Sequence, residues 1–181
     1  MPDKVTIYCD LPDTVRDWLP KVAEHWKKPG PADAMGRQSM APDPSTPEVW
    51  VRRRLLEITK NHGNGINQVR ARGFVEYQKD ATSRIKVSLA DLELAKFKPV
   101  QTRGNFSIIV GDLLASRLPF VAALITQQHE KLSPSIGRKY ESFEEWLTEY
   151  LTNEVTSGYT RYEDEAIEQD IEHPAPTPKA E

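Results

Sequence analysis

The 181-residue sequence has little of what several protein classes require. Its single cysteine, Cys9, excludes an internal disulfide and a zinc site built from several cysteines. No run approaches the roughly 18 apolar residues that a membrane-spanning helix needs, and the first residues lack the layout of a secretory signal peptide. We therefore expect a protein of the cytoplasm, or of the interior of a host cell, that does not enter a membrane.

Motifs that carry catalysis are also missing. The sequence contains no GxxxxGK(S/T), GxGxxG or GxSxG run, so phosphate-loop, dinucleotide-binding and serine-elbow geometries lack their residues. The four histidines, at positions 25, 62, 129 and 173, stand far apart without the spacing of a metal site. We expect no enzyme, no cofactor and no bound metal. An active site assembled from distant residues is the alternative.

Charge is distributed very unevenly along the chain. Residues 51–139 hold 16 Lys/Arg against 7 Asp/Glu, a net charge of +9, whereas residues 140–181 hold 2 against 12, a net charge of −10. This polarity is typical of a body that binds a polyanion and is followed by an acidic tail. The alternative is that the basic side chains only solvate helix faces.

The apolar content of 38% suffices for a core, and the patterning predicts a mainly α fold with short β strands. We expect three regions: 1–62, interrupted by a proline-rich loop over 27–47; a basic core over 63–157; and a disordered acidic tail over 158–181. Strands are expected over 5–12, 73–78 and 84–89, the last two as a hairpin, and helices over 13–26, 47–60, 92–97, 106–118, 119–132 and 143–155.

In the run RIKVSL, residues 84–89, apolar side chains alternate with polar or basic ones. In a strand Ile85, Val87 and Leu89 share one face, while Arg84, Lys86 and Ser88 share the other. An apolar face needs a core beneath it. A face of donor side chains suits base edges in the major groove, which admits a two-stranded ribbon. A solvent-facing amphipathic strand is the plainer interpretation.

The longer run RIKVSLADLELAKFKPVQTRGNFSIIVGDLLASRL, residues 84–118, resembles the ribbon-helix-helix family of DNA-binding proteins. The resemblance implies a ribbon-helix-helix-like core in which strands of two chains pair into a ribbon that enters the major groove. Pro99, which interrupts the first expected helix of this run, departs from the family pattern. The resemblance implies two sets of contacts: base-facing Arg84, Lys86 and Ser88, and a phosphate clamp of Arg103, Asn105 and Ser107 at the start of the second helix.

We therefore expect a small DNA-binding protein, a regulator or a phage- or plasmid-type accessory factor, that binds double-stranded DNA as a homo-oligomer; RNA is an alternative ligand. Sequence-independent phosphate contacts are expected from Arg52, Arg53, Arg54, Arg70, Arg72 and Arg103. The rival hypothesis is a protein–protein adaptor, such as a virion connector, an assembly component or an inhibitor of another complex. It would dock through apolar runs within 119–151 or through the acidic tail.

Overall fold

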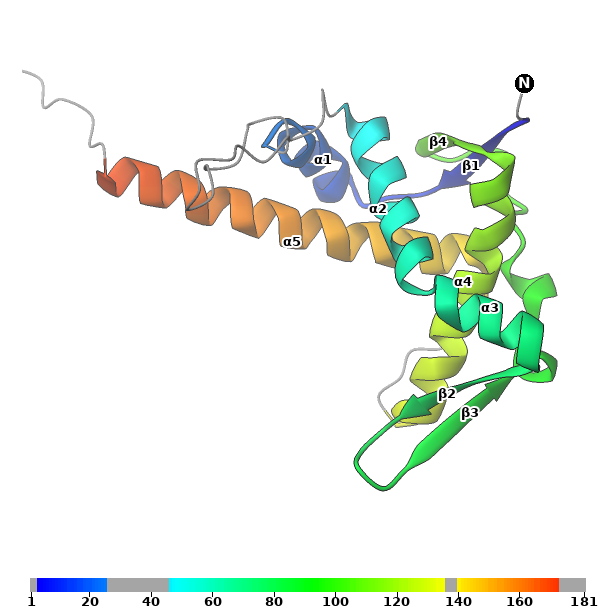
Figure 1. The fold of residues 1–181 in the computed structure, drawn as a ribbon. Helices are drawn as coiled ribbons and strands as arrows, with labels where there is room; N and C mark the ends of the chain where they lie inside the picture. The colour runs from blue at the N-terminus through cyan, green and yellow to red at the C-terminus, as the bar shows by residue number, and fades with distance from the viewer. Residues whose placement is uncertain (1–2, 26–45, 136–139, 173–181) are drawn as a thin grey trace, which may run out of the picture.

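A computed structural model describes residues 3–25, 46–135 and 140–172 (Figure 1). The expected loop over 27–47 lies outside them, apart from Thr46 and Pro47. Helices dominate and two short antiparallel sheets accompany them, which confirms the predicted mainly α fold with short strands. The elements are β1 (Lys4–Cys9), α1 (Asp13–His25), α2 (Pro47–Asn61), α3 (Gly63–Arg72), β2 (Phe74–Gln78), β3 (Arg84–Ser88), the 3-10 turns η1 (Leu89–Asp91) and η2 (Leu94–Phe97), β4 (Phe106–Gly111), α4 (Asp112–Leu132) and α5 (Phe143–Glu172).

The first sheet joins the two ends of a long stretch of sequence. The N-terminal strand forms as expected, and β1 pairs antiparallel with β4 so that Ile7 lies opposite Ile108. Alternate residues of both strands, among them Cys9 and Val110, are buried in the core. Apolar side chains that alternate along each strand therefore cover one face of this sheet.

Residues 106–111 form a strand where a helix is expected, so that prediction is wrong for this segment. Phe106, Ile109 and Val110 fit a helical stripe, but Ile108 and Val110 also fit the period of a strand. Pairing with β1 buries Ile108 and Val110 to 1% exposure each and gives the backbone its hydrogen bonds. The helix begins only at Asp112, an acidic residue in its first turn.

The order of elements over 84–118 is strand, two 3-10 turns, strand and helix. It differs from the strand, helix and helix that the resemblance implies. The expected helix over 92–97 is limited to the short turn η2, and Lys98 after it has an extended backbone with ψ of 135°. Pro99 accounts for this, because the residue before a proline disfavours the helical conformation.

Helix α4 spans 21 residues without interruption and contains Pro119 in its interior, where the sequence predicts the first turn of a separate helix. Val121, Ala122, Ala123 and Leu124 on this helix are all buried. The apolar run that was expected to dock a partner therefore belongs to the core.

Helix α5 begins at the predicted start, Phe143, and Glu145 N donates to Ser142 Oγ at 3.1 Å as a cap. Phe143, Trp146 and Leu147 are buried, so this second expected docking run is also core. The helix continues to Glu172, so the expectation of disorder is wrong over 158–172, and residues 173–181 lie outside the described part.

Helix α1 packs along the later part of α5 and explains why that part is helical. Trp18 stacks on Tyr159 with ring centroids 4.6 Å apart and planes 7° apart. Further along, His25 Nε2 lies 3.1 Å from Glu165 Oε2. Tertiary contacts of this kind, rather than the intrinsic preferences of the residues, supply most of a helix's stability.

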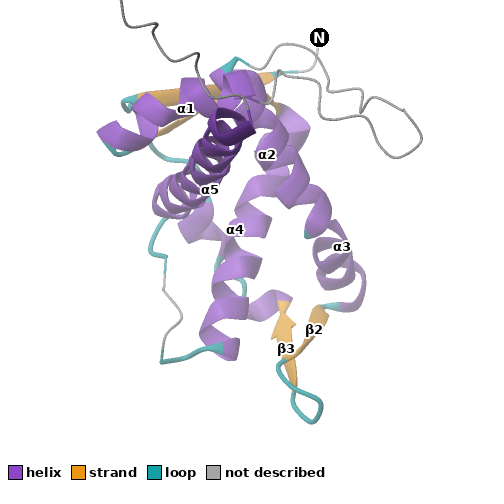
Figure 2. Cartoon of the chain, turned by 90° about the vertical axis from the view of Figure 1, so that its left-hand side faces the viewer, coloured by secondary structure: helices purple, strands orange, loops and turns teal. Residues whose placement is uncertain are grey.

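The second sheet is the predicted hairpin, in which β2 pairs antiparallel with β3. It lies at one end of α4, and the β1–β4 sheet lies at the other end (Figures 1 and 2). Within the described residues no helix is long and apolar enough to cross a membrane.

Candidate nucleic-acid interface

The β2–β3 hairpin has one buried face and one exposed face. Val75 lies opposite Val87 and both are buried, while the pair Tyr77 and Ile85 continues this inner face. The exposed face carries the alternate residues of both strands. They form three cross-strand pairs, Phe74–Ser88, Glu76–Lys86 and Gln78–Arg84.

Local interactions at both ends of the hairpin hold it in shape. Gly73 ends α3 with φ of +75°, a left-handed conformation that glycine adopts without strain. At the tip, Asp80 Oδ1 accepts hydrogen bonds from Thr82 N at 2.9 Å and from Ser83 N at 2.7 Å. These bonds stabilise the carboxylate, which lowers the pKa of Asp80 to about 2.

Arg84, Lys86 and Ser88 share the exposed face, as the sequence predicts. The side chains of Arg84 and Lys86 are 77% and 63% exposed, and Ser88 is half-buried. Neither cation is isolated, because Glu76 on the neighbouring strand lies close to both. Lys86 Nζ also lies 4.8 Å from the centre of the Phe74 ring.

The outer edge of β3 is occupied by the protein's own side chains. Lys131 Nζ, at the end of α4, donates to Lys86 O at 2.7 Å and lies 2.8 Å from Asp91 Oδ2. Ser88 N donates to the same carboxylate at 3.1 Å. β2 pairs with one edge of β3, and on the other edge these contacts occupy Lys86 O and Ser88 N. The ribbon seen here joins two strands of one chain, whereas the resemblance implies a ribbon made by two chains.

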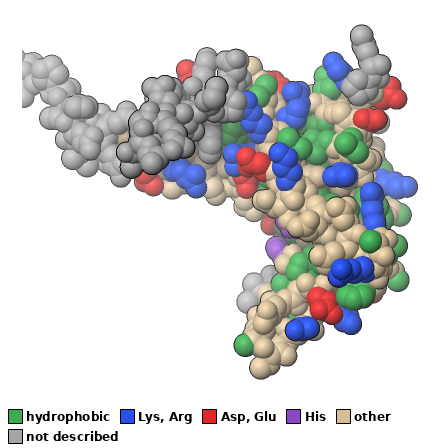
Figure 3. Space-filling view, in the orientation of Figure 1, with side chains coloured by type: hydrophobic (Ala, Val, Ile, Leu, Met, Phe, Trp, Pro, Cys, Tyr) green, Lys and Arg blue, Asp and Glu red, His purple; other side chains and the backbone are tan. Residues whose placement is uncertain are grey.

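The arginines of α3 lie next to the hairpin in sequence and in space. Arg72 is exposed and stands two residues before β2, whereas the guanidinium of Arg70 lies 4.5 Å from the centre of the Phe120 ring on α4. Lys and Arg side chains run along one face of the molecule from α2 past α3 to the hairpin (Figure 3). This arrangement retains the basic character that the sequence predicts.

The three arginines of α2 have different surroundings. Arg52 is exposed and donates through Nε to Ile109 O at 3.1 Å, which uses one of its five N–H donors. Arg53 is half-buried. Arg54 is only 19% exposed and lies 3.0 Å from Glu57 and 3.8 Å from Glu154, so its charge is engaged inside the fold. Arg54 is therefore poorly placed to contact phosphate, and it is left out of the interface proposed below.

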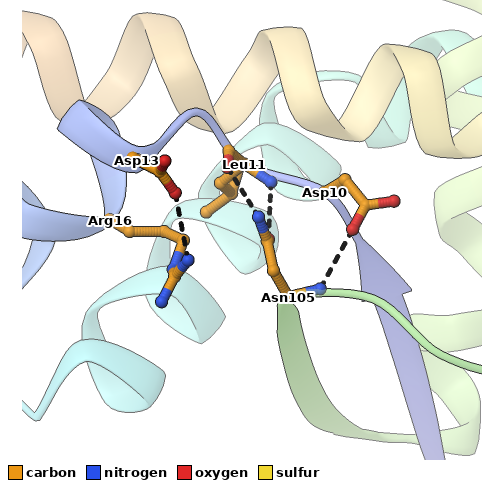
Figure 4. Close-up of polar contacts among 5 residues, drawn as sticks. All are labelled: Asp10, Leu11, Asp13, Arg16 and Asn105. Carbon is orange, nitrogen blue, oxygen red and sulfur yellow. Dashed lines mark hydrogen bonds and ion pairs between the residues drawn. The ribbon is translucent and has the colours of Figure 1, made fainter.

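The expected phosphate clamp does not form, because no helix begins at Asn105. Its side chain bridges the backbone of Leu11, accepting from Leu11 N and donating to Leu11 O at 2.8 Å each (Figure 4). Its own N–H donates to Asp10 Oδ1 at 3.0 Å. Ser107 is an exposed residue of β4 and Arg103 an exposed loop residue. These hydrogen bonds thus connect the segment after β1 to the segment before β4.

Two side chains away from this surface, Cys9 and Glu144, have structural surroundings. Burial raises the pKa of the Cys9 thiol to about 12, so it stays protonated and is a poor nucleophile. Glu144 Oε1 accepts from Val100 N at 2.7 Å and from Gln101 N at 3.0 Å, which is a structural role. Among the described residues, no three His, Cys, Asp or Glu side chains are placed to hold a metal ion.

Three participants at this surface were not singled out by the sequence analysis: Glu76, Phe74 and Lys131. Glu76 and Phe74 belong to the alternating run GFVEYQ, and their place on the exposed face follows once the hairpin register is known. Lys131 lies 45 residues from Lys86 in sequence. No local signal indicates that pairing.

Comparison of the chain with protein-family models, with curated proteins and with solved structures finds no match. Any functional assignment therefore depends on the residues of this surface and on their surroundings.

Proposed function

We propose that this protein is a non-enzymatic DNA-binding protein that places the exposed face of the β2–β3 hairpin in the major groove of double-stranded DNA. The observation that carries the proposal is the exposure of Arg84 and Lys86 on the outer face of a ribbon whose other face is anchored in the core. The major groove admits such a ribbon, and Arg and Lys donate there to guanine O6 and N7. Gln78 on the same face suits adenine.

Phosphate contacts would come from exposed arginines beside the ribbon. Arg72 directly precedes the hairpin, and Arg70 stands on the same helix. Arg52 and Arg103 are exposed farther from it. Such contacts set the register of a protein on the duplex, while contacts to base edges select the sequence. A regulatory or accessory role in the cytoplasm, or inside a host cell, would follow from this activity.

The first test removes the two exposed cations of the hairpin. The double variant Arg84→Ala/Lys86→Ala should bind a selected duplex at least about tenfold more weakly in fluorescence anisotropy, because each good contact to a base contributes roughly 1–3 kcal/mol. The matched control is Lys4→Ala/Arg161→Ala, which removes the same charge from exposed positions on β1 and α5. Equal losses in the two double variants would contradict reading by the hairpin.

Salt dependence tests the phosphate contacts. The logarithm of the association constant should fall linearly with the logarithm of salt concentration, with a slope of about −0.9 per phosphate contact. Arg72→Ala should reduce the magnitude of that slope by about one contact and weaken binding equally for all sequences. An affinity that does not change with salt would contradict the proposal.

Double-stranded RNA provides a second comparison. Its A-form major groove is deep and narrow, so a protein ribbon cannot enter it. We expect clearly weaker binding to an RNA duplex than to a DNA duplex of the same sequence. Equal affinities would indicate backbone contact without groove insertion.

The adaptor hypothesis is the second candidate, and one observation favours it. Ile109 and Leu113, at the junction of β4 and α4, are 49% and 66% exposed although both are apolar. Exposed apolar side chains that gather in a patch mark interaction surfaces. If no duplex binds at low salt, this junction is the surface to test by replacing Leu113 with Ser.

A further inference from the structure

Glu76 occupies the centre of the exposed hairpin face. It lies directly opposite Lys86 in the register, and Arg84 is the next residue along on the same face of β3. One carboxylate oxygen is 3.5 Å from Lys86 Nζ and the other is 3.8 Å from an Arg84 guanidinium nitrogen. The two cations of the proposed interface therefore share one acidic neighbour. Over the hairpin, acidic and basic side chains lie side by side on the visible face (Figure 3).

Stability alone does not explain this carboxylate. The Glu76 side chain is 38% exposed and its partners are more exposed still, and exposed ion pairs contribute little to folding. On a surface that contacts only phosphate, a carboxylate between two cations would weaken binding because it repels the phosphate. A role that needs a hydrogen-bond acceptor explains its position better.

Base edges in the major groove supply such a role. In a G·C pair the guanine presents the acceptors N7 and O6, and the cytosine beside it presents the N4 amino group as a donor. A cation and a carboxylate in contact with each other match this pattern, because the cation donates to guanine while the carboxylate accepts from cytosine. At an A·T pair the donor is adenine N6, and thymine O4, an acceptor, lies where a G·C pair presents cytosine N4, so a carboxylate placed to accept from cytosine meets an acceptor there.

We propose that Glu76 is a specificity-determining residue of the hairpin, and that together with Arg84 or Lys86 it selects a G·C pair by accepting a hydrogen bond from cytosine N4. The inference rests on the proposed function, since it requires that the hairpin enters the major groove. The same carboxylate repels phosphate, so it lowers affinity for arbitrary duplexes. It thereby increases the ratio of the affinity for a correct site to the affinity for an incorrect one.

The experiment selects binding sites from a randomised DNA duplex with the full-length wild type and with Glu76→Gln, and then measures affinities by anisotropy. Gln keeps the size of Glu but removes the charge and adds a donor that suits adenine. We expect the wild type to select G·C at one position. Glu76→Gln should lose about five- to tenfold discrimination there and bind arbitrary duplexes more tightly. Glu163→Gln, at an exposed position on α5, is the control for loss of one negative charge.

The outcomes separate the two proposals. If the wild type binds no duplex at low salt, DNA binding itself fails and this inference fails with it. If the wild type binds but shows no base preference, or if Glu76→Gln keeps the same preference at every position, DNA binding stands and the role of Glu76 is overturned. Circular dichroism of both variants checks folding, and Glu76→Ala replaces Glu76→Gln if the latter is misfolded.

Discussion

Asn105 gives the sharpest distinction between a structural residue and a DNA contact. Replacing it with Ala removes the two side-chain hydrogen bonds to the backbone of Leu11, each 2.8 Å long, but keeps the bond from its own N–H to Asp10. Each hydrogen bond contributes about 1 kcal/mol net, and a buried polar group left without its partner costs more. Leu11 is only 3% exposed, so its N–H and C=O are poorly placed to recover the bonds from water.

We therefore expect Asn105→Ala to lower the free energy of unfolding by about 2–3 kcal/mol, with a fall in Tm of about 5–10 °C for a chain of this size. Urea denaturation and a thermal melt followed by circular dichroism measure both. Ser107→Ala, at an exposed position on β4, should change stability by less than about 0.5 kcal/mol.

DNA affinity of the folded Asn105→Ala variant should equal that of the wild type, because the side chain is committed to Leu11. Unchanged stability with weakened DNA binding would refute this reasoning and would restore Asn105 as a phosphate ligand. Asn105→Asp is a second check. It keeps an acceptor for Leu11 N but loses the donor to Leu11 O and places a second carboxylate beside Asp10.

Two further predictions concern other contacts that hold the sheets. Gly104→Ala should cost about 2 kcal/mol or more in urea unfolding, because a Cβ there would lie 2.5 Å from Cys9 O, whereas Gly63→Ala, with open space around it, should not destabilise. The hydrogen bonds from Lys131 and Ser88 lower the pKa of Asp91 from 3.8 to about 2. Its contribution to stability is thus present above pH 4 and lost as the pH falls to 2. Asp91→Asn should be less stable than the wild type at pH 6, and the difference should vanish near pH 2; a constant difference would contradict the assignment.

Local patterns predicted the hairpin and the starts of α1, α2 and α5 correctly, because their causes lie within a few residues. Val75, Val87 and their alternating neighbours separate the two faces of the hairpin in any context that supplies a core. The cap of α2 works in the same way, since Thr46 Oγ1 accepts from Val49 N at 3.3 Å. The exposed positions of Arg84 and Lys86 follow from the same alternation.

The segment over 106–111 could not be decided locally, because its apolar residues fit both a helix and a strand. The pairing of Ile108 with Ile7 decides it, and these residues are about a hundred positions apart in the chain. Asn105 does not bind phosphate as expected for the same reason. Because residues 106–111 form a strand, no helix begins at Asn105, and its amide side chain hydrogen-bonds the backbone of Leu11 instead.

By itself, the amino-acid sequence determined the mainly helical class, the two-faced hairpin and its exposed cations, since each depends on short-range periodicity. Only the tertiary structure decided that Lys131 contacts the outer edge of β3, that Arg54 is engaged by Glu154, and that Glu76 lies between Arg84 and Lys86. Those outcomes depend on which segments meet. Burial of apolar surface drives that meeting, and the polar side chains then take the partners that the packing places beside them.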